Sequence, residues 1–518
     1  MQFPRASGIL LHPTSLPGRF GIGDLGDASY RFIDFLAETG QQLWQIMPLG
    51  PTGYGDSPYQ ALSAFAGNPL LISLDRLVAE HCLAWWDLEA SPAFPSDTVD
   101  YGPVIAFKSR LLRLSFQNFQ ATAADAEHAA LAEFAAANND WLDDYALFAA
   151  LKEAHGGAHW RAWGPELVTR RPEALAAARR DLAPAIAYQR YLQFQFVRQW
   201  TALKVYASAR GVRIIGDLPI FVADDSADAW AHPDQFYFDA LGRPTLVAGI
   251  PPDYFSPTGQ RWGNPVYRWD AMAADGYAWW IGRFRTTLRL VDVVRLDHFR
   301  GFVACWAVPA DAPTAVEGHW HKGPGAALFR AAEAALGPLP LIAEDLGLIT
   351  PRVEALLADL GCPGMRVLQF AFGDTDSRYL PHNYTHNTVV YTGTHDNDTT
   401  RGWWLALSPT ERTFAQKYLA RHGDDIHWDL IRAALGSIAD IALFPLQDVL
   451  GIGSDGRMNT PGKATGNWGW RFREEALDEG VRRRLAEMTL LYGRAPAPRA
   501  AAVAGGGGRY WPAPEDEA

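Results

Sequence analysis

Acidic and other polar side chains follow several short apolar runs of the sequence. The segments IIGDLPIF, VVRLDHFRG, LIAEDLG and VVYTGTHDND each place at least one carboxyl group directly after such a run. The polar residues found there are Asp217, Arg295, Asp297, His298, Glu344, Asp345, His395, Asp396 and Asp398. Carboxylates that are brought together repel one another, so a cluster of them is costly unless chemistry uses it. These segments therefore mark a candidate catalytic centre.

A structural role is also open to some of these acids. An acid that follows a strand often caps the next helix, and Asp217, Asp345 and Asp398 are each placed to do so. For any one of them alone, capping is the better interpretation. Carboxyl groups at three separate strand ends favour a catalytic centre, because capping gives no reason for them to converge.

Two kinds of chemistry use such a cluster. The first is a divalent metal site, with Asp297, Glu344, His395 and Asp396 as ligands. The second is glycoside chemistry, in which one carboxylate attacks the anomeric carbon and a second carboxyl group donates a proton. Arg295 and Asp297 lie on the same side of a strand, so the cation can keep that carboxylate ionised, as a nucleophile requires. Glu344 follows the apolar run LPLIA, where burial raises a carboxyl pKa, and we therefore expect glycoside chemistry and no metal.

The elements that position these residues are short apolar runs closed by turn residues. Eight such runs are found, at residues 8–11, 43–48, 212–217, 291–297, 339–344, 365–370, 388–392 and 441–445. Nearly continuous apolar character is typical of strands covered on both faces, as in a parallel sheet. Helical patterns lie between the runs, including one over residues 28–39 that ends at Gly40. The alternation predicts an α/β fold, a (β/α)₈ barrel, whose carboxyl strand ends form the active-site face.

The spacing of the runs predicts two insertions in a barrel that spans residues 1–494. Residues 68–210 are rich in Ala, Leu, Glu and Arg, and they are expected to form a helical subdomain. Residues 221–277 are loop-like and rich in Pro, Gly and aromatic residues, which indicates a functional loop subdomain. Residues 495–518 are rich in Ala, Gly and Pro and are expected to be a disordered tail. The stretch after RMNTPG is too short for a C-terminal β-sandwich domain.

Composition excludes several classes of partner. The net charge of −12 disfavours nucleic-acid binding. The three cysteines show no CxxC pair, which argues against a disulfide framework and a zinc site. No signal peptide and no run of 18 apolar residues is found, so we expect a cytoplasmic protein that does not enter a membrane.

With these residues in view, the chain resembles the amylomaltase or 4-α-glucanotransferase family, glycoside hydrolase family 77 of the α-amylase clan. The resemblance covers residues 7–494. It rests on SGILLHPTSLPGRFGIGDLG, WQIMPLGPTGYGDSPYQ, GDLPIFVADDSADAW, GIPPDYFSPTGQRWGNP, RLDHFRG, AEDLG, TGTHDNDT and RMNTPG, in the order of the family.

The resemblance implies roles for the candidate residues. Asp297 would be the nucleophile, Glu344 the acid and base, and Asp396 the carboxylate that grips two sugar hydroxyls. Arg295 and His395 would support charge and bind hydroxyls, Tyr59 would stack under the sugar, and Asp217 would bind a hydroxyl there. Tyr254 and Phe255 are expected on a lid over the cleft. Further glucan contacts would be Gln260, Trp262, Asn264, His298, Asp374 and Asn459, although Trp262 also suits a core position and Asn264 a turn.

The activity implied is transfer of α-1,4-glucan segments between maltooligosaccharides or to glucose, with retention, without a cofactor, and with cycloamyloses as further products. The expected state is a monomer or homodimer. The alternative in the same clan is a hydrolase of the α-amylase or α-glucosidase type, which differs only in whether water intercepts the intermediate. A glucan-binding protein without activity is disfavoured, because all three carboxylates are present. Retention predicts a separation of about 5–5.5 Å between the carboxyl groups of Asp297 and Glu344.

Overall fold

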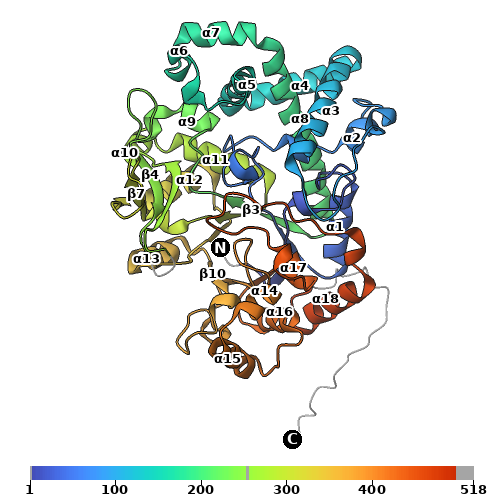
Figure 1. The fold of residues 1–518 in the computed structure, drawn as a ribbon, viewed down its shortest axis with the longest axis vertical. Helices are drawn as coiled ribbons and strands as arrows, with labels where there is room; N and C mark the ends of the chain where they lie inside the picture. Colours follow the sequence, from blue (N-terminus) through green and yellow to red (C-terminus); the bar gives the residue numbers. More distant parts are fainter. Residues whose placement is uncertain (1–2, 253–255, 497–518) are drawn as a thin grey trace, which may run out of the picture.

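The centre of the molecule is a closed barrel of eight parallel strands, as seen in a computed structural model that describes residues 3–252 and 256–496 (Figure 1). Neighbouring barrel strands follow one another in chain order, and the last pairs with the first. The strands are β1 (Ala6–Leu10), β2 (Leu43–Gln45), β3 (Arg213–Leu218), β6 (Val293–Leu296), β9 (Leu341–Ala343), β10 (Gly364–Val367), β11 (Thr388–Tyr391) and β12 (Ile441–Pro445).

The predicted (β/α)₈ barrel is confirmed. Each of the eight apolar runs overlaps one barrel strand, and most strand residues are buried, because side chains fill the barrel and helices cover its outside. The predicted first helix is α1 (Asp27–Glu38), which buries Phe32, Phe35 and Leu36 against the barrel. Gly40 follows it with a φ of 71°, a left-handed conformation that favours glycine.

Helices occupy most of residues 68–210, as expected from composition. In Figure 1 they rise above the barrel, and α8 runs from this group back to β3. They are α2 (Leu74–Ala79), α3 (Tyr101–Thr122), α4 (Asp125–Ala137), α5 (Asn139–Ala154), α6 (Pro165–Val168), α7 (Pro172–Asp181) and α8 (Ala183–Ala209). A core separate from that of the barrel includes Trp141, Phe148, Trp160 and Trp163.

The segment 221–277 is more regular than the loop-like character predicted for it. It contains α9 (Ala227–Ala231), β4 (Leu246–Ile250), β5 (Gln260–Pro265) and α10 (Trp269–Ala274). β4 and β5 join β7 (Ala304–Pro309) and β8 (His319–Lys322) in an antiparallel sheet of order β5-β4-β7-β8. Sequence reasoning did not reveal this sheet, because the pairing partners of β4 lie beyond β6 in the chain.

The remaining helices surround the barrel and close its lower side in Figure 1. They are α11 (Ala278–Leu290), α12 (Ala326–Leu336), α13 (Pro351–Leu360), α14 (Thr400–Ala406), α15 (Pro409–Leu419), α16 (Ile426–Gly436), α17 (Leu446–Val449) and α18 (Glu479–Leu491). After α18, the buried guanidinium of Arg494 donates to the carbonyls of Ala6, Leu435 and Ala439, which ties the end of the barrel to its beginning.

Three of the sequence-based expectations fall on residues outside those described. These are Tyr254, Phe255 and nearly all of the tail at 495–518. The division into a barrel over 1–494 with subdomains at 68–210 and 221–277 stays a prediction. Among residues 3–252 and 256–496, no helix combines the length and the apolar character that crossing a membrane requires.

Candidate active site

A buried arginine links two carboxylates at the carboxyl ends of β3 and β6. Arg295 Nη1 lies 2.7 Å from both carboxylate oxygens of Asp217 and 3.1 Å from Asp297 Oδ1. The contact with Asp297 is the one expected from their spacing on the strand. The closer partner is Asp217, which neighbours Arg295 in the β3–β6 register. The guanidinium therefore neutralises a buried acid and also faces the carboxylate of Asp297.

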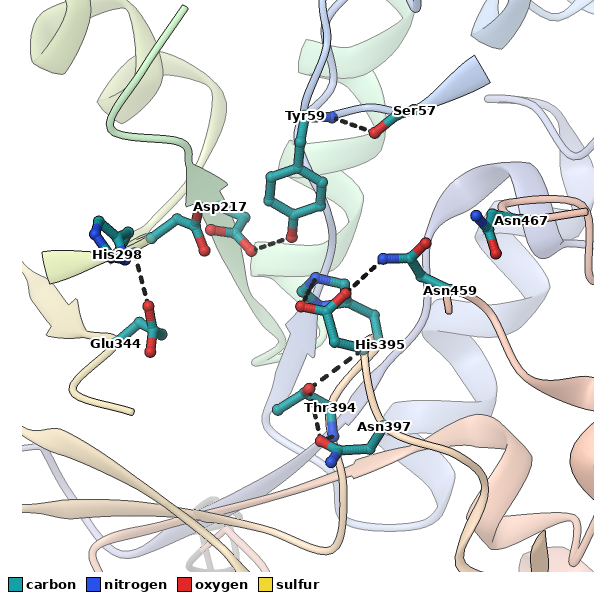
Figure 2. A network of polar contacts seen from close by, with 12 residues as sticks. Ser57, Tyr59, Asp217, His298, Glu344, Thr394, His395, Asn397, Asn459 and Asn467 are labelled. Atoms are coloured by element: carbon teal, nitrogen blue, oxygen red, sulfur yellow. Dashed lines mark hydrogen bonds and ion pairs between the residues drawn. The ribbon is translucent and has the colours of Figure 1, made fainter. Parts of the chain in front are cut away.

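Tyr59 is held over this pair by its hydroxyl and by its ring. The hydroxyl donates to Asp217 Oδ2 at 2.7 Å, and the ring stacks on His395 with centroids 5.1 Å apart (Figure 2). Trp468 contacts both rings, at 5.7 Å from Tyr59 and 5.9 Å from His395. Burial and the negative charge of Asp217 raise the pKa of Tyr59 well above its ordinary value, so its hydroxyl stays a donor. The loop that carries Tyr59 is thus fixed to β3 and to the segment after β11.

Glu344 follows β9 and is held by backbone donors. Its Oε2 accepts from the backbone N–H of His298 at 2.7 Å, and its Oε1 accepts from that of Leu346 at 2.8 Å. His298 has a φ of 48°, a left-handed conformation that is uncommon outside glycine and that aims this N–H at the carboxylate. Burial and the negative charge of Asp297 raise the pKa of Glu344 to about 8, against the opposing effect of Arg295. At neutral pH Glu344 is therefore mostly protonated.

Asp297 has a different proton affinity from Glu344. Burial, together with the charges of Asp217 and Asp396, raises its pKa to about 6, against the lowering effect of Arg295. These mutual effects mean that the three candidate carboxylates converge on one region, as expected from their strand ends. Near pH 7, Asp297 is mostly ionised beside a protonated Glu344. Such a pair has one group suited to attack and one suited to donate a proton.

Asp396 stands at the open side of the cluster, with a side chain that is 48% exposed. Its Oδ1 accepts from Asn459 Nδ2 at 2.6 Å, and its Oδ2 lies 3.5 Å from His395 Nε2 (Figure 2). Arg457 donates to the backbone carbonyl of Asp396 at 2.7 Å. Asp396, His395 and Asn459 therefore form a second group of polar side chains facing Asp297.

Three candidate residues lie on β5, and one of them contacts His298. The ring of Trp262 meets that of His298 edge to face at 4.9 Å, and its indole N–H donates to Gln260 Oε1 at 3.2 Å. Trp262 is only partly buried, so it is not simply a core residue. Asn264 is buried and donates to the carbonyl of Val222 at 2.8 Å, a contact that braces the backbone. Burial and the charge of Arg300 lower the pKa of His298 to about 3, so its imidazole is neutral.

Some sequence-based candidates lie apart from this cluster. Asp374 is on an exposed turn, where its carboxylate accepts from the backbone N–H of Asp376. Asp345 and Asp398 are not helix caps. Asp345 is buried and binds Arg366 and Arg378, and Asp398 accepts from the hydroxyl of Ser454. Asp217 is not a cap either, because it lies within β3 and the next helix is capped by Ser226.

Sequence reasoning missed Trp468 and Arg457. Trp468 has a φ of 63°, and no local pattern in NWGW indicates that its ring reaches Tyr59. Arg457 lies in the RMNTPG motif and was the more accessible of the two to prediction. Within the part of the chain that the structure describes, no group of three or more His, Cys, Asp or Glu side chains is arranged to hold a metal ion.

Comparison with known proteins decides the family. Residues 11–477 match the family model described as 4-alpha-glucanotransferase. The chain belongs to the 4-α-glucanotransferase family. A 4-alpha-glucanotransferase of Synechocystis sp. is 52% identical over 95% of this chain and 98% of its own, and one of Thermus thermophilus is 51% identical over 94% and 99%. These matches over nearly the whole chain assign it 4-α-glucanotransferase activity.

A solved structure agrees with this assignment. The amylomaltase of Streptococcus agalactiae, determined in complex with acarbose, superposes with a TM-score of 0.92 at 40% identity. It covers 95% of this chain, and this chain covers all of it. The fold described here is therefore one found in an amylomaltase.

Proposed function

We propose that glucan transfer proceeds with retention, by double displacement, with Asp297 as nucleophile and Glu344 as acid and base. The observation that carries this proposal is the difference between the two carboxyl groups. Arg295 contacts Asp297, whose pKa is about 6, whereas Glu344 accepts from two backbone N–H groups and has a pKa of about 8. One enzyme state therefore presents both a carboxylate and an acid at neutral pH, as retaining glycoside chemistry requires.

In the first step, a carboxylate oxygen of Asp297 bonds to the anomeric carbon of the donor glucan. Glu344 gives its proton to the glycosidic oxygen, and the bond between that oxygen and the anomeric carbon breaks. The chain on the reducing side leaves with a free 4-hydroxyl, and the rest remains as a covalent β-glucosyl ester. Asp396, oriented by Asn459 and His395, binds two hydroxyls of the distorted sugar and stabilises positive charge in the transition state.

In the second step, Glu344 is ionised and acts as base. It takes the proton of an acceptor 4-hydroxyl, whose oxygen attacks the anomeric carbon, and the bond to Asp297 breaks. The product again has an α-1,4 linkage. Glucose and maltooligosaccharides serve as acceptors, and the non-reducing end of the same chain gives a cycloamylose. Water in place of the acceptor would give hydrolysis, and the preference for transfer follows the activity of the family.

The other candidate residues bind the glucan on either side of the bond that is cleaved. Tyr59 offers a ring face whose position is set by His395, and Asp217 and Arg295 bind hydroxyls beneath it. Gln260, Trp262 and His298 form a wall from β5 to β6, with Asn264 bracing it. Asp374 contacts a more distant sugar. The acarbose complex of the similar amylomaltase supports an oligosaccharide in this cleft, and the acting unit is a monomer or homodimer.

The decisive experiment is incubation with maltotriose alone, followed by separation of the products by size. Longer maltodextrins with free glucose, at constant reducing ends, would support transfer, whereas shorter sugars with rising reducing ends would contradict it. Proton NMR of the first product formed from an α-linked donor tests retention, and an initial β-anomer would overturn the double displacement.

A further inference from the structure

Two glutamines on α8 each bind one residue of another segment through both polar atoms of the amide. Gln193 Oε1 accepts from the backbone N–H of Gly67 at 2.7 Å, and its Nε2 donates to the Gly67 carbonyl at 2.9 Å. Gln199 binds Ser73 in the same way, at 2.7 and 3.3 Å. Both glutamines are buried, so losing a backbone partner would leave a polar group unsatisfied. The stretch 67–73 is thus attached to α8 at two matched points.

Gly67 also lies directly against an aromatic ring of the same helix. A Cβ at this position would be 2.0 Å from Phe196 Cδ1, so a side chain cannot be added without moving the helix or the loop. Gln193 and Phe196 are three residues apart on α8 and share a face. The amide of Gln193 and the ring of Phe196 together fix Gly67 against α8.

The segment before Gly67 is attached to α9. The backbone N–H of Ala64 donates to the buried carboxylate of Asp228 at 2.7 Å, and the N–H of Ala227 donates to the Leu62 carbonyl at 2.9 Å. Residues 62–67 therefore take part of their backbone hydrogen bonds from helices outside the barrel, beside local bonds such as that from the Leu62 N–H to the Pro51 carbonyl. They directly follow the part of the loop that carries Tyr59.

The inner side of this segment faces a cavity. The cavity has a volume of about 80 Å³ and is lined by Tyr59, Ala61, Phe65, Asp217, Phe221 and Arg283 among others. On the other side, the bonds of Gly67 to Gln193 and of Ala64 to Asp228 hold the backbone, while the ring of Phe65 packs on Trp141 and Trp279. A change at Gly67 can therefore be passed along the segment towards Tyr59.

We propose that Gln193 is a positioning residue, through which the helical insertion holds the 62–67 segment and thereby the ring of Tyr59 at the sugar site. The proposal rests on the proposed function, because it assumes that Tyr59 contacts the glucan. It makes the helical insertion part of substrate recognition without placing any of its residues in the cleft. Gln199 provides a matched control, since it makes the same pair of bonds at Ser73, farther along the chain from Tyr59.

The test compares Gln193→Leu, Gln199→Leu and Gln193→Glu with the unmodified protein. Each leucine variant loses two hydrogen bonds of the same kind, so similar losses of thermal stability are expected. Only Gln193→Leu is expected to raise KM for maltotriose, by about tenfold, with a smaller change in kcat. Protonated glutamic acid has a donor and an acceptor in the places of the amide, so Gln193→Glu is expected to approach the unmodified KM at low pH and to depart from it as pH rises.

Hydrogen exchange tests, independently of catalysis, whether Gln193 holds the backbone of residues 62–67; we call this attachment the Gly67 clamp. Exchange in residues 60–68 should accelerate in Gln193→Leu and stay unchanged in Gln199→Leu. Equal KM values in the two leucine variants would overturn the positioning role, as would unchanged exchange in residues 60–68 of Gln193→Leu. If the unmodified protein does not disproportionate maltotriose while exchange behaves as expected, the proposed function is wrong. The attachment of residues 62–67 by Gln193 is then still supported.

Discussion

Arg295 Nη1 donates to both carboxylate oxygens of Asp217 at 2.7 Å, although Asp297 is the acid nearer in sequence. The side chain of Asp217 is only 1% exposed, so the arginine neutralises a buried charge. Asp297 receives the longer contact at 3.1 Å and keeps a pKa of about 6. Arg295 thus binds Asp217 through two short contacts and Asp297 through one longer contact.

Replacing Arg295 tests this relationship. Arg295→Met should lower the free energy of unfolding by about 3–5 kcal/mol at neutral pH, because the buried Asp217 carboxylate is left without a cation. The measurement is urea denaturation followed by fluorescence. Adding Asp217→Asn should restore most of that stability without restoring transfer. A single variant as stable as the unmodified protein would show that Asp217 is not held in this way.

The two carboxyl pKa values predict a bell-shaped pH dependence of kcat/KM. Asp297 must be ionised to attack, so activity should fall as pH drops through about 6. Glu344 must be protonated to donate, so activity should fall as pH rises through about 8. Initial rates of maltotriose transfer at low substrate concentration provide the profile. Constant activity from pH 6 to well below 5 would exclude this assignment of Asp297.

Glu344→Gln separates proton donation from nucleophilic attack. With maltotriose as donor, the rate should fall by about 10²–10⁴-fold, because no acid protonates the leaving oxygen. With α-maltotriosyl fluoride the loss should be much smaller in the first step, since fluoride leaves without a proton. Mass spectrometry should then detect a glycosyl adduct on Asp297. An equal loss with both donors would mean that Glu344 is not the acid.

Glu344 also has a consequence for stability. Its folded pKa of about 8 exceeds the ordinary value of 4.5, so the folded state binds the proton more tightly than the unfolded state. Its contribution is full below the ordinary pKa and is lost as pH rises towards 8. The Tm of Glu344→Gln relative to the unmodified protein should therefore rise over this interval. A difference in Tm that does not change with pH would contradict the raised pKa.

Asn459 allows a test of the group around Asp396. Asn459→Asp places a second carboxylate where an amide now donates at 2.6 Å, so repulsion should weaken transfer more than the loss of the amide in Asn459→Ala. The comparison of kcat/KM for the two variants is the measurement. Equal losses would show that Asp396 does not act as a charged group.

Sensitivity to chelators separates glycoside chemistry from the metal-site alternative. Transfer from maltotriose should be unchanged after dialysis against EDTA, because the proposed steps use only carboxyl groups. Loss of activity that a divalent cation restores would support the alternative.

The sequence predicts the barrel and its acids because both are local features. Each strand is a short apolar run, and Asp297, Glu344 and Asp396 follow directly from such runs or from turns after them. The antiparallel sheet was not predictable in this way. His319–Lys322, for example, is a mostly exposed edge strand with two histidines, and only its pairing with β7 makes it a strand.

Contacts between distant loops were the least accessible from sequence. Nothing in the spacing of Tyr59 and Trp468 indicates that their rings meet, because the intervening chain forms most of the barrel. The clamp on Gly67 is similar, since a glutamine in a long helix is usually a solvated surface residue. Resemblance to a family named Tyr59 without explaining how it is held.

The antiparallel sheet also bears on the order in which this protein folds. β4 pairs with β7, so the chain between them, which includes α11 and β6, becomes a closed loop. Forming that loop costs entropy, and the cost is smaller when β6 has already paired with β3 and β9. Barrel pairing and sheet pairing therefore assist each other. The strand that precedes Asp297 is expected to become structured together with the sheet, as one cooperative unit.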